Sequence, residues 1–207
     1  MSETLIPFII VFFFSVVAFA WSVDRRFNLL EVGRTDQRFD HIGQRLQNMF
    51  YYAIFQRRVA GRKFGLNHVV LFWGFLVLLI ANAEFLLGGL FPGIIGLSLL
   101  PFGAYQVLGS IFDVVSVIVL LAVLVAVARR LFFPPSYIDA GSRDAFLILG
   151  LVALLMIAYF GLHAAEMRLL QLEGYTGPLP YLISGWAAGV FLPGASELLL
   201  DKYVTYY

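Results

Sequence analysis

The sequence predicts an all-α integral membrane protein with four transmembrane helices, an amphipathic cytoplasmic helix, and a fifth transmembrane helix beyond them. Three observations predict it. Of the 207 residues, 61% are hydrophobic and 13% are charged, about half the charged share of a soluble domain. Four apolar stretches are long enough to cross a hydrocarbon core of about 30 Å. The basic residues gather between these stretches rather than within them. Because lipid cannot satisfy backbone hydrogen bonds, each stretch must be helical.

The first span covers residues 5–23. No basic residue precedes it, and its apolar run exceeds the hydrophobic region of a signal peptide. It is therefore expected to be a first anchor in a single membrane domain, residues 1–207.

The other spans are 67–91, 105–128 and 145–167, and the basic residues set their orientation. The segment 24–66 holds nine of the fourteen Lys and Arg residues. Three more lie between the third and fourth spans, and none lies between the second and third. The positive-inside rule then predicts an N-terminus outside and a cytoplasmic 24–66 loop.

The cytoplasmic loop contains a helical pattern of its own. Apolar residues recur at helical spacing in "TDQRFDHIGQRLQNMFYYAIFQRRV", at Phe39, Ile42, Leu46, Met49, Phe50 and Ile54. This predicts an amphipathic helix on the inner leaflet. His41 lies on its polar face and is interpreted as a solvated surface histidine.

The tail, residues 178–200, is interrupted by Pro180 and Pro193, and its apolar run is too short to span. We expect an outer re-entrant or interfacial segment there. The following "LLLDKYVTYY" resembles an aromatic belt at the start of a span, so the fifth helix is expected to begin where the chain ends.

His68 and His163 are the candidate metal ligands. Both lie in apolar spans, where an ionisable group is costly unless it has a partner or a function. The sequence lacks cysteine, so a redox centre would be non-covalent and held by histidine. Axial ligation of haem b is the functional interpretation, and a histidine hydrogen-bonded across a helix interface is the alternative.

The neighbours of the two histidines favour haem. Gly65 and Gly161 would let a flat macrocycle approach the backbone, and Phe72 and Tyr159 could pack on it. Three basic residues before His68 could pair with haem propionates: Arg58, Arg62 and Lys63.

The two histidines cannot serve one haem. His68 opens its helix, whereas His163 stands about 18 residues into another, so their depths differ by roughly 25 Å. We expect two haems, inner and outer, with the missing helix supplying the other ligands.

The stretches "MFYYAIFQRRVAGRKFGLNHVVLFWGFLVLL", "PPSYIDAGSRDAFLILGLVALLM" and "FGLHAAE" resemble a known family. This is the membrane cytochrome b of the nitrate reductase gamma-subunit superfamily, which includes the heterodisulfide reductase cytochrome b subunit. More closely, they resemble the N-terminal domain of bacterial membrane-bound (Fe-S) oxidoreductases, some of which are thought to be electron transfer flavoprotein:menaquinone oxidoreductases.

The resemblance implies a bacterial cytoplasmic membrane location, haem ligation by His68 and His163, and a quinone site near a membrane face. It also implies that the basic loop 24–66 docks a cytoplasmic iron–sulfur, heterodisulfide reductase-like domain or subunit, and it raises electron transfer flavoprotein as a further partner. Menaquinone would be the substrate, and no nucleic-acid partner is expected.

Three carboxylates are candidates for proton or quinone chemistry: Glu84, Asp113 and Glu166. Glu84 and Glu166 should lie at similar depth, and water-contacting interfacial carboxylates are the alternative interpretation. Asp113 is harder to dismiss because its helix is otherwise apolar.

Three functions remain open from the sequence. The first is the electron-transfer part of a quinone-linked oxidoreductase. The second is a small proton-conducting or transporter subunit, which the expected absence of a polar stripe along any span disfavours. The third is a haemless membrane anchor.

Overall fold

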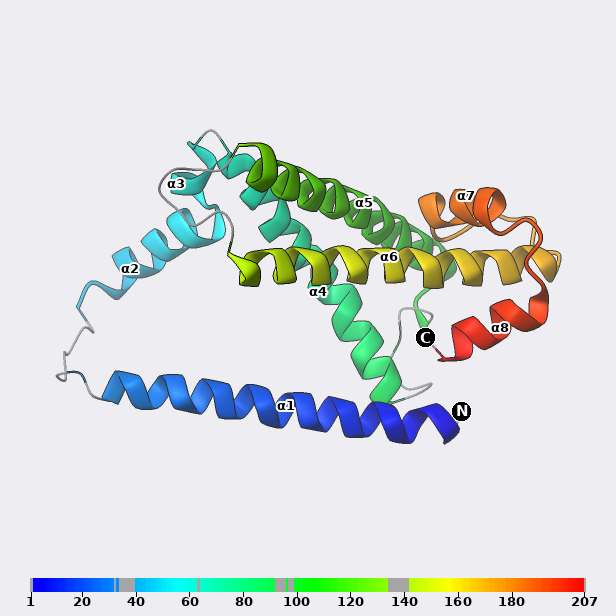
Figure 1. Ribbon diagram of the computed structural model, residues 1–207, viewed down its shortest axis with the longest axis horizontal. Coiled ribbons are helices and arrows are strands. Elements are labelled where there is room, and N and C mark those ends of the chain that lie inside the picture. The colour runs from blue at the N-terminus through cyan, green and yellow to red at the C-terminus, as the bar shows by residue number, and fades with distance from the viewer. Residues whose placement is uncertain are drawn as a thin grey trace.

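The chain folds into helices joined by turns (Figure 1). The computed structural model describes residues 2–31, 33, 40–62, 64–91, 96, 99–133 and 142–206, and these residues contain no strand. The elements in chain order are α1 (Ser2–Glu31), α2 (Ile42–Met49), the π-helical η1 (Phe50–Ile54), α3 (Arg57–Ala60), α4 (Gly65–Leu90), α5 (Phe102–Phe132), α6 (Arg143–Leu172), α7 (Leu182–Phe191) and α8 (Glu197–Tyr206).

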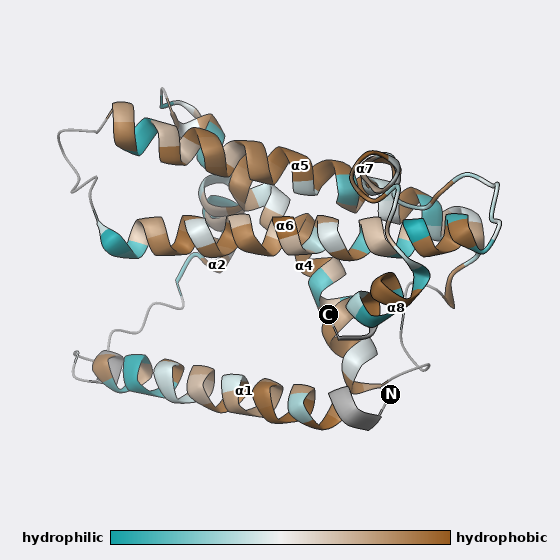
Figure 2. Ribbon diagram, turned by 45° about the vertical axis from the view of Figure 1, so that its right-hand side comes forward, coloured by the Kyte–Doolittle hydropathy of each residue, from teal (hydrophilic) through white to brown (hydrophobic). Residues whose placement is uncertain are grey.

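Four of these helices, α1, α4, α5 and α6, are long and apolar enough to cross a membrane, which confirms the predicted fold class. Figure 2 shows their hydrophobic bodies. The helices extend past the predicted spans at most ends, reaching Phe132 in α5 and Leu172 in α6. The predicted spans were drawn from the apolar stretches alone. The helices are longer because helical hydrogen bonding continues into the polar residues on either side.

Helix α5 is the centre of the bundle, with α4 and α6 packed against it. Their shared core contains Leu78, Phe112, Val119, Val123 and Met156. Helix α1 lies to one side of the bundle and contacts the C-terminal part of α4 (Figure 1), and none of its most apolar stretch is buried. A lipid-facing helix needs no protein cover because lipid tails are as apolar as leucine.

Successive long helices alternate in direction (Figure 1), so five of their six arginines gather at one end of the molecule, and Arg168 of α6 lies toward the other. This arginine-rich end contains the C-terminal ends of α1 and α5 and the N-terminal ends of α4 and α6. Its arginines on these four helices are Arg25, Arg26, Arg129, Arg130 and Arg143. Helices α7 and α8 lie at the opposite end (Figure 1).

The expected amphipathic helix is present in part. Helix α2 continues into the π-helical turn η1, and the chain then breaks at Gln56, which has a positive φ of 48°. Large apolar side chains of this segment are exposed, among them Ile42, Leu46 and Phe50. Phe39 of the predicted pattern lies outside the described residues.

The tail, predicted as an outer re-entrant or interfacial segment, contains two short helices, α7 and α8. Helix α7 packs against α6 and α5, and α8 packs against α6. Ala188 of α7 is fully buried, so this part of the tail is integral to the bundle.

Gly74 permits the close approach of α4 to α5, because a Cβ there would overlap Val119 Cγ2. We expect Gly74→Val to cost about 1–3 kcal/mol through overpacking and to lower the melting temperature of the detergent-solubilised protein. Gly150→Ala on α6 is the matched control, because a Cβ there meets nothing within 4 Å. Equal melting temperatures for Gly74→Val and the wild type would contradict this packing.

Candidate functional site

His163 lies in the half of α6 nearer the opposite end and lines a cavity of about 100 Å³. Helix α4 contributes Glu84 and Asn82 to the same cavity, and the chain before α7 contributes Tyr181. The apolar part of the lining comes from α4, α5 and α6. Glu84 and His163 therefore meet at one depth, although they belong to different helices.

Two side chains hold the His163 imidazole, and a third packs beside it. Its Nδ1 lies 2.7 Å from Oε2 of Glu166, one turn later on α6. Because an ionised carboxylate only accepts hydrogen bonds, this contact makes Nδ1 the donor and leaves Nε2 as the ligating or accepting nitrogen. Tyr181 stacks on the ring at 3.9 Å and 15° between planes, and Tyr159 packs edge-on at 4.3 Å.

The two tyrosines differ in hydrogen bonding. Tyr181 bonds to Tyr105 of α5, and burial is the main cause that raises the pKa of its phenol far above the ordinary value. It therefore stays protonated at any physiological pH. The Tyr159 hydroxyl oxygen is buried and has no hydrogen-bond partner among the described residues.

Asp113 of α5 fixes the position of Tyr181. Its carboxylate is fully buried and accepts hydrogen bonds from the backbone N–H groups of Ile183 (2.5 Å) and Ser184 (2.9 Å) and from the Ser184 hydroxyl (2.6 Å). These amides belong to the first turn of α7, which leaves its N–H groups unpaired. Asp113 thus caps α7 from another helix, and the negative charge suits the positive end of the helix dipole.

Asp113 belongs to a polar stripe along one face of α5, and the expectation that no span has such a stripe was wrong. Gln106 Nε2 donates to the Pro178 carbonyl, and Ser110 Oγ donates to the Pro180 carbonyl at 3.1 Å. The spacing of Gln106, Ser110 and Asp113 is helical. The stripe satisfies backbone groups of the tail before α7 and in the first turn of α7, which lipid cannot do.

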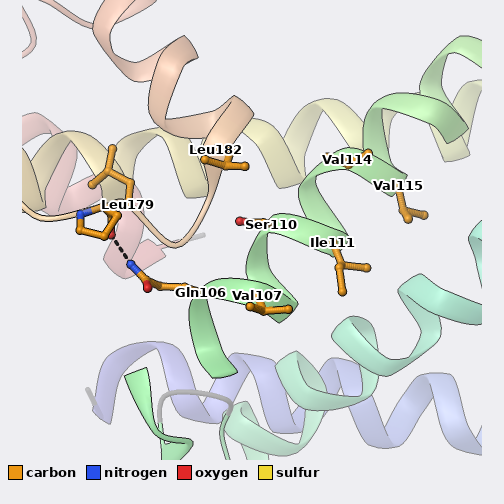
Figure 3. Close-up of a pocket in the computed structure, with 9 residues that line it drawn as sticks. Gln106, Val107, Ser110, Ile111, Val114, Val115, Leu179 and Leu182 are labelled. Carbon is orange, nitrogen blue, oxygen red and sulfur yellow. Dashed lines mark hydrogen bonds between the residues drawn. The ribbon is translucent and has the colours of Figure 1, made fainter. Parts of the chain in front are cut away.

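A second and larger cavity, about 540 Å³, lies between α5 and the chain before α7 (Figure 3). It is an open, mainly apolar groove, and its size falls in the range of about 300–1,000 Å³ for small-molecule sites. Its lining is Gln106, Val107, Ser110, Ile111, Val114, Val115, Pro178, Leu179 and Leu182.

The segment 178–182 separates the groove from the His163 cavity. Leu179 and Leu182 line the groove, whereas Tyr181 lines the cavity. A molecule in the groove would therefore lie one layer of side chains from the imidazole. The sequence alone did not show this layer, because the residues of α5 that hold segment 178–182 in place precede it by 70 to 72 positions.

His68 lies in the first turn of α4 at the arginine-rich end and is exposed. Its neighbour Asn67 ties α4 to α5 by donating to the Ala122 carbonyl at 3.0 Å. Phe72, one turn later, is half-buried and packs edge-on against Trp73.

The basic residues predicted to hold propionates lie in different surroundings. The guanidinium of Arg58 lies over the Tyr52 ring, Arg62 is exposed, and Lys63 lies outside the described residues. Arg129 of α5 was not predicted. Its guanidinium lies over Phe64, one turn before His68, and its Nε–H is buried with no partner among the described residues.

The two glycines predicted to admit a macrocycle have protein neighbours instead. A Cβ on Gly65 would overlap the Val59 backbone, and a Cβ on Gly161 would lie 2.7 Å from the Tyr203 hydroxyl oxygen of α8. Both glycines therefore allow close chain contacts in this structure.

The structure keeps the two histidines far apart. Glu84, which lines the His163 cavity, follows His68 on the same helix by sixteen residues (68 to 84). Sixteen residues of α-helix extend about 24 Å. One iron atom cannot bind both imidazoles.

The chain offers donor groups that suit haem, but the cavity at His163 is too small to enclose one. His163 has the carboxylate partner that orients a ligating imidazole, and His68 has arginines at its end of the bundle. The 100 Å³ cavity at His163 is well below small-molecule size. The described residues include no cluster of three or more potential metal ligands. Each histidine could supply one axial bond, and the rest of a haem site would have to come from outside the described residues.

No protein-family model matches the chain, and no solved structure matches it. The chain is 33% identical over 139 residues to EtfAB:quinone oxidoreductase from Syntrophomonas wolfei. This similarity covers 64% of the chain and 19% of that protein. The chain therefore spans about a fifth of the length of the relative that it matches.

Removing the Asp113 carboxylate should loosen α7. Asp113→Ala leaves buried amides unpaired, and losing hydrogen bonds to a charged group costs about 1.5–3 kcal/mol. We expect hydrogen exchange of the Ile183 and Ser184 amides to accelerate about tenfold or more, with a smaller effect for Asp113→Asn.

The control is Asp144→Ala, which removes an exposed carboxylate from the first turn of α6. If α7 exchanges at the same rate in Asp113→Ala as in this control, the carboxylate does not hold the helix.

Proposed function

We propose that this chain is the membrane part of a quinone-linked oxidoreductase, carrying electrons between a redox partner at the arginine-rich end and a quinone at the opposite end. The observation that carries the proposal is the identity to EtfAB:quinone oxidoreductase. The geometry supports it, because one intramembrane histidine lies toward each end of the bundle.

His68 and His163 are proposed as one axial ligand each for two haems b, which would supply one-electron transfer across the membrane. The chain's own residues orient these ligands. Glu166 accepts the Nδ1–H of His163, and Tyr181 stacks on the ring so that it cannot turn freely. At the other end, Arg62 and Arg129 would pair with propionates.

The proposed quinone site is the groove between α5 and segment 178–182. A quinone combines an apolar tail with carbonyl acceptors. The apolar lining suits the tail, and the Gln106 amide has two N–H donors, of which one bonds the Pro178 carbonyl. Menaquinone is the proposed substrate. Glu84 and Glu166, on the other side of Tyr181, would exchange protons with the outer surface.

The proposed partner at the arginine-rich end is an iron–sulfur domain or subunit that receives electrons from electron transfer flavoprotein. The basic loop 24–66 would steer such a partner, since opposite charges accelerate encounter. A transporter function is disfavoured, because Gln106, Ser110 and Asp113 hydrogen-bond to the tail.

Haem is tested by spectroscopy on the protein purified from its native membranes. Dithionite reduction should produce the α band of a b-type cytochrome, and His68→Ala and His163→Ala should each lower the haem per protein by about half. His41→Ala, which changes the exposed residue before α2, should leave the haem content unchanged.

Two outcomes would count against the haem assignment. Wild-type protein without a Soret band would leave the membrane-anchor interpretation. Loss of one and the same haem in both variants would contradict the separation of the two histidines.

The groove is tested by filling it. Val107→Trp should raise the KM for a soluble menaquinone analogue about tenfold, because the indole occupies the space of the substrate. Leu121→Trp is the matched control: both side chains are exposed on α5, by 60% and 56%, but only Val107 lines the groove. Equal KM values for the two variants would exclude this groove as the quinone site.

A further inference from the structure

Two neighbouring arginines at the arginine-rich end are held by two neighbouring tyrosines. The guanidinium of Arg57 lies 4.6 Å from the centre of the Tyr51 ring, and that of Arg58 lies 4.6 Å from the centre of the Tyr52 ring. Both tyrosines are exposed, so the two pairs stand side by side on the surface.

The backbone between the pairs produces this arrangement. Each arginine follows its tyrosine by six residues, which a regular helix would not place face to face. The π-helical turn Phe50–Ile54 and the left-handed Gln56, with φ of 48°, reverse the chain so that α3 folds back on η1. A positive φ is uncommon for glutamine and carries strain, and such strained positions and π-turns concentrate at functional sites.

Stacking leaves the arginines ready to bind an anion. A guanidinium over an aromatic ring keeps its N–H groups at the edge of the plane, where they match phosphate oxygens. Because the side chains are already ordered, binding costs less conformational entropy than for free arginines.

The surrounding charge is unbalanced. Segments 40–62, 64–70 and 125–133 contain one acidic residue, Asp40, and it pairs with Arg45 at 2.6 Å. Asp24 of α1 and Asp144 of α6 also lie at this end, where arginines outnumber them. Arg57 and Arg58 have no acidic partner among the described residues. A negative ligand would therefore be attracted to this end of the molecule.

The expected depth of the two pairs in the membrane indicates the class of ligand. The pairs lie just before α4, a helix of membrane-spanning length, and are flanked by the exposed rings of Phe50, Phe55 and Phe64. Exposed rings next to basic residues at the start of a span belong at the level of lipid headgroups. A phospholipid matches both features of the site, because its phosphate suits the arginines and its acyl chains suit the exposed rings.

We propose that Arg57 and Arg58, positioned by Tyr51 and Tyr52, form a binding site for the phosphate of an anionic phospholipid in the leaflet at the arginine-rich end. The site does not depend on haem or quinone.

The test uses the full chain in detergent, titrated with phosphatidylglycerol or phosphatidylcholine and analysed by native mass spectrometry. Wild-type protein should retain phosphatidylglycerol about tenfold more strongly. A basic residue near an anionic surface contributes about a fivefold change in affinity, so Arg57→Gln/Arg58→Gln should remove this preference.

Two further variants distinguish a specific site at the stacked pairs from attraction by the overall positive charge of this end. Arg26→Gln/Arg143→Gln removes the same two charges from the same end and should change the affinity less than twofold. Tyr51→Leu/Tyr52→Leu keeps every charge and should weaken binding about fivefold. Circular dichroism confirms that each variant retains its helices.

Four results would overturn the proposal. These are equal retention of both lipids by the wild type, equal losses in the two double-arginine variants, unchanged binding in the tyrosine variant, and displacement of phosphatidylglycerol by millimolar inorganic phosphate. The last would show a free-anion site rather than a lipid site. The proposal is supported if the preference for phosphatidylglycerol persists in millimolar phosphate and is lost only in the variants that change the stacked arginine–tyrosine pairs.

Discussion

The carboxylate of Asp113 determines the architecture of the end opposite the arginines. Backbone that leaves a helix within a bundle of membrane-spanning helices needs partners that lipid cannot provide. Asp113 provides them for the first turn of α7, and Gln106 and Ser110 provide them for the residues before it. This contact fixes segment 178–182, which forms one wall of the groove and carries Tyr181 onto His163.

The two ends of the bundle place their histidines in different surroundings. His163 is oriented by Glu166 and Tyr181 and borders a small cavity. His68 is exposed at a surface dominated by arginine. About 24 Å of α4 separates the two depths, a separation that suits the two-step electron transfer proposed above. In the proposed function each end would supply one axial ligand, and the rest of each haem site would come from groups beyond the described residues.

The sequence predicted what depends on local composition and missed what depends on long-range contacts. Hydropathy was sufficient for four long helices, because lipid imposes their length and helicity. The neighbours of Gly65 and Gly161 could not be inferred, since the Val59 backbone and Tyr203 that face them come from other elements. Asp113 stood out as a buried charge, but its donors lie 70 and 71 residues away. The helical spacing of Gln106, Ser110 and Asp113 was a signal that could have revealed the polar stripe.

The central claim is that segment 178–182 separates a quinone groove from His163. Photoaffinity labelling of native membranes with an azido-menaquinone, followed by peptide mapping, tests it most directly. The account predicts labelled residues in the stretch of α5 between Gln106 and Val115 and in segment 178–182, with labelling suppressed by excess menaquinone. Suppressible labelling confined to other helices, with none at these two segments, would contradict it.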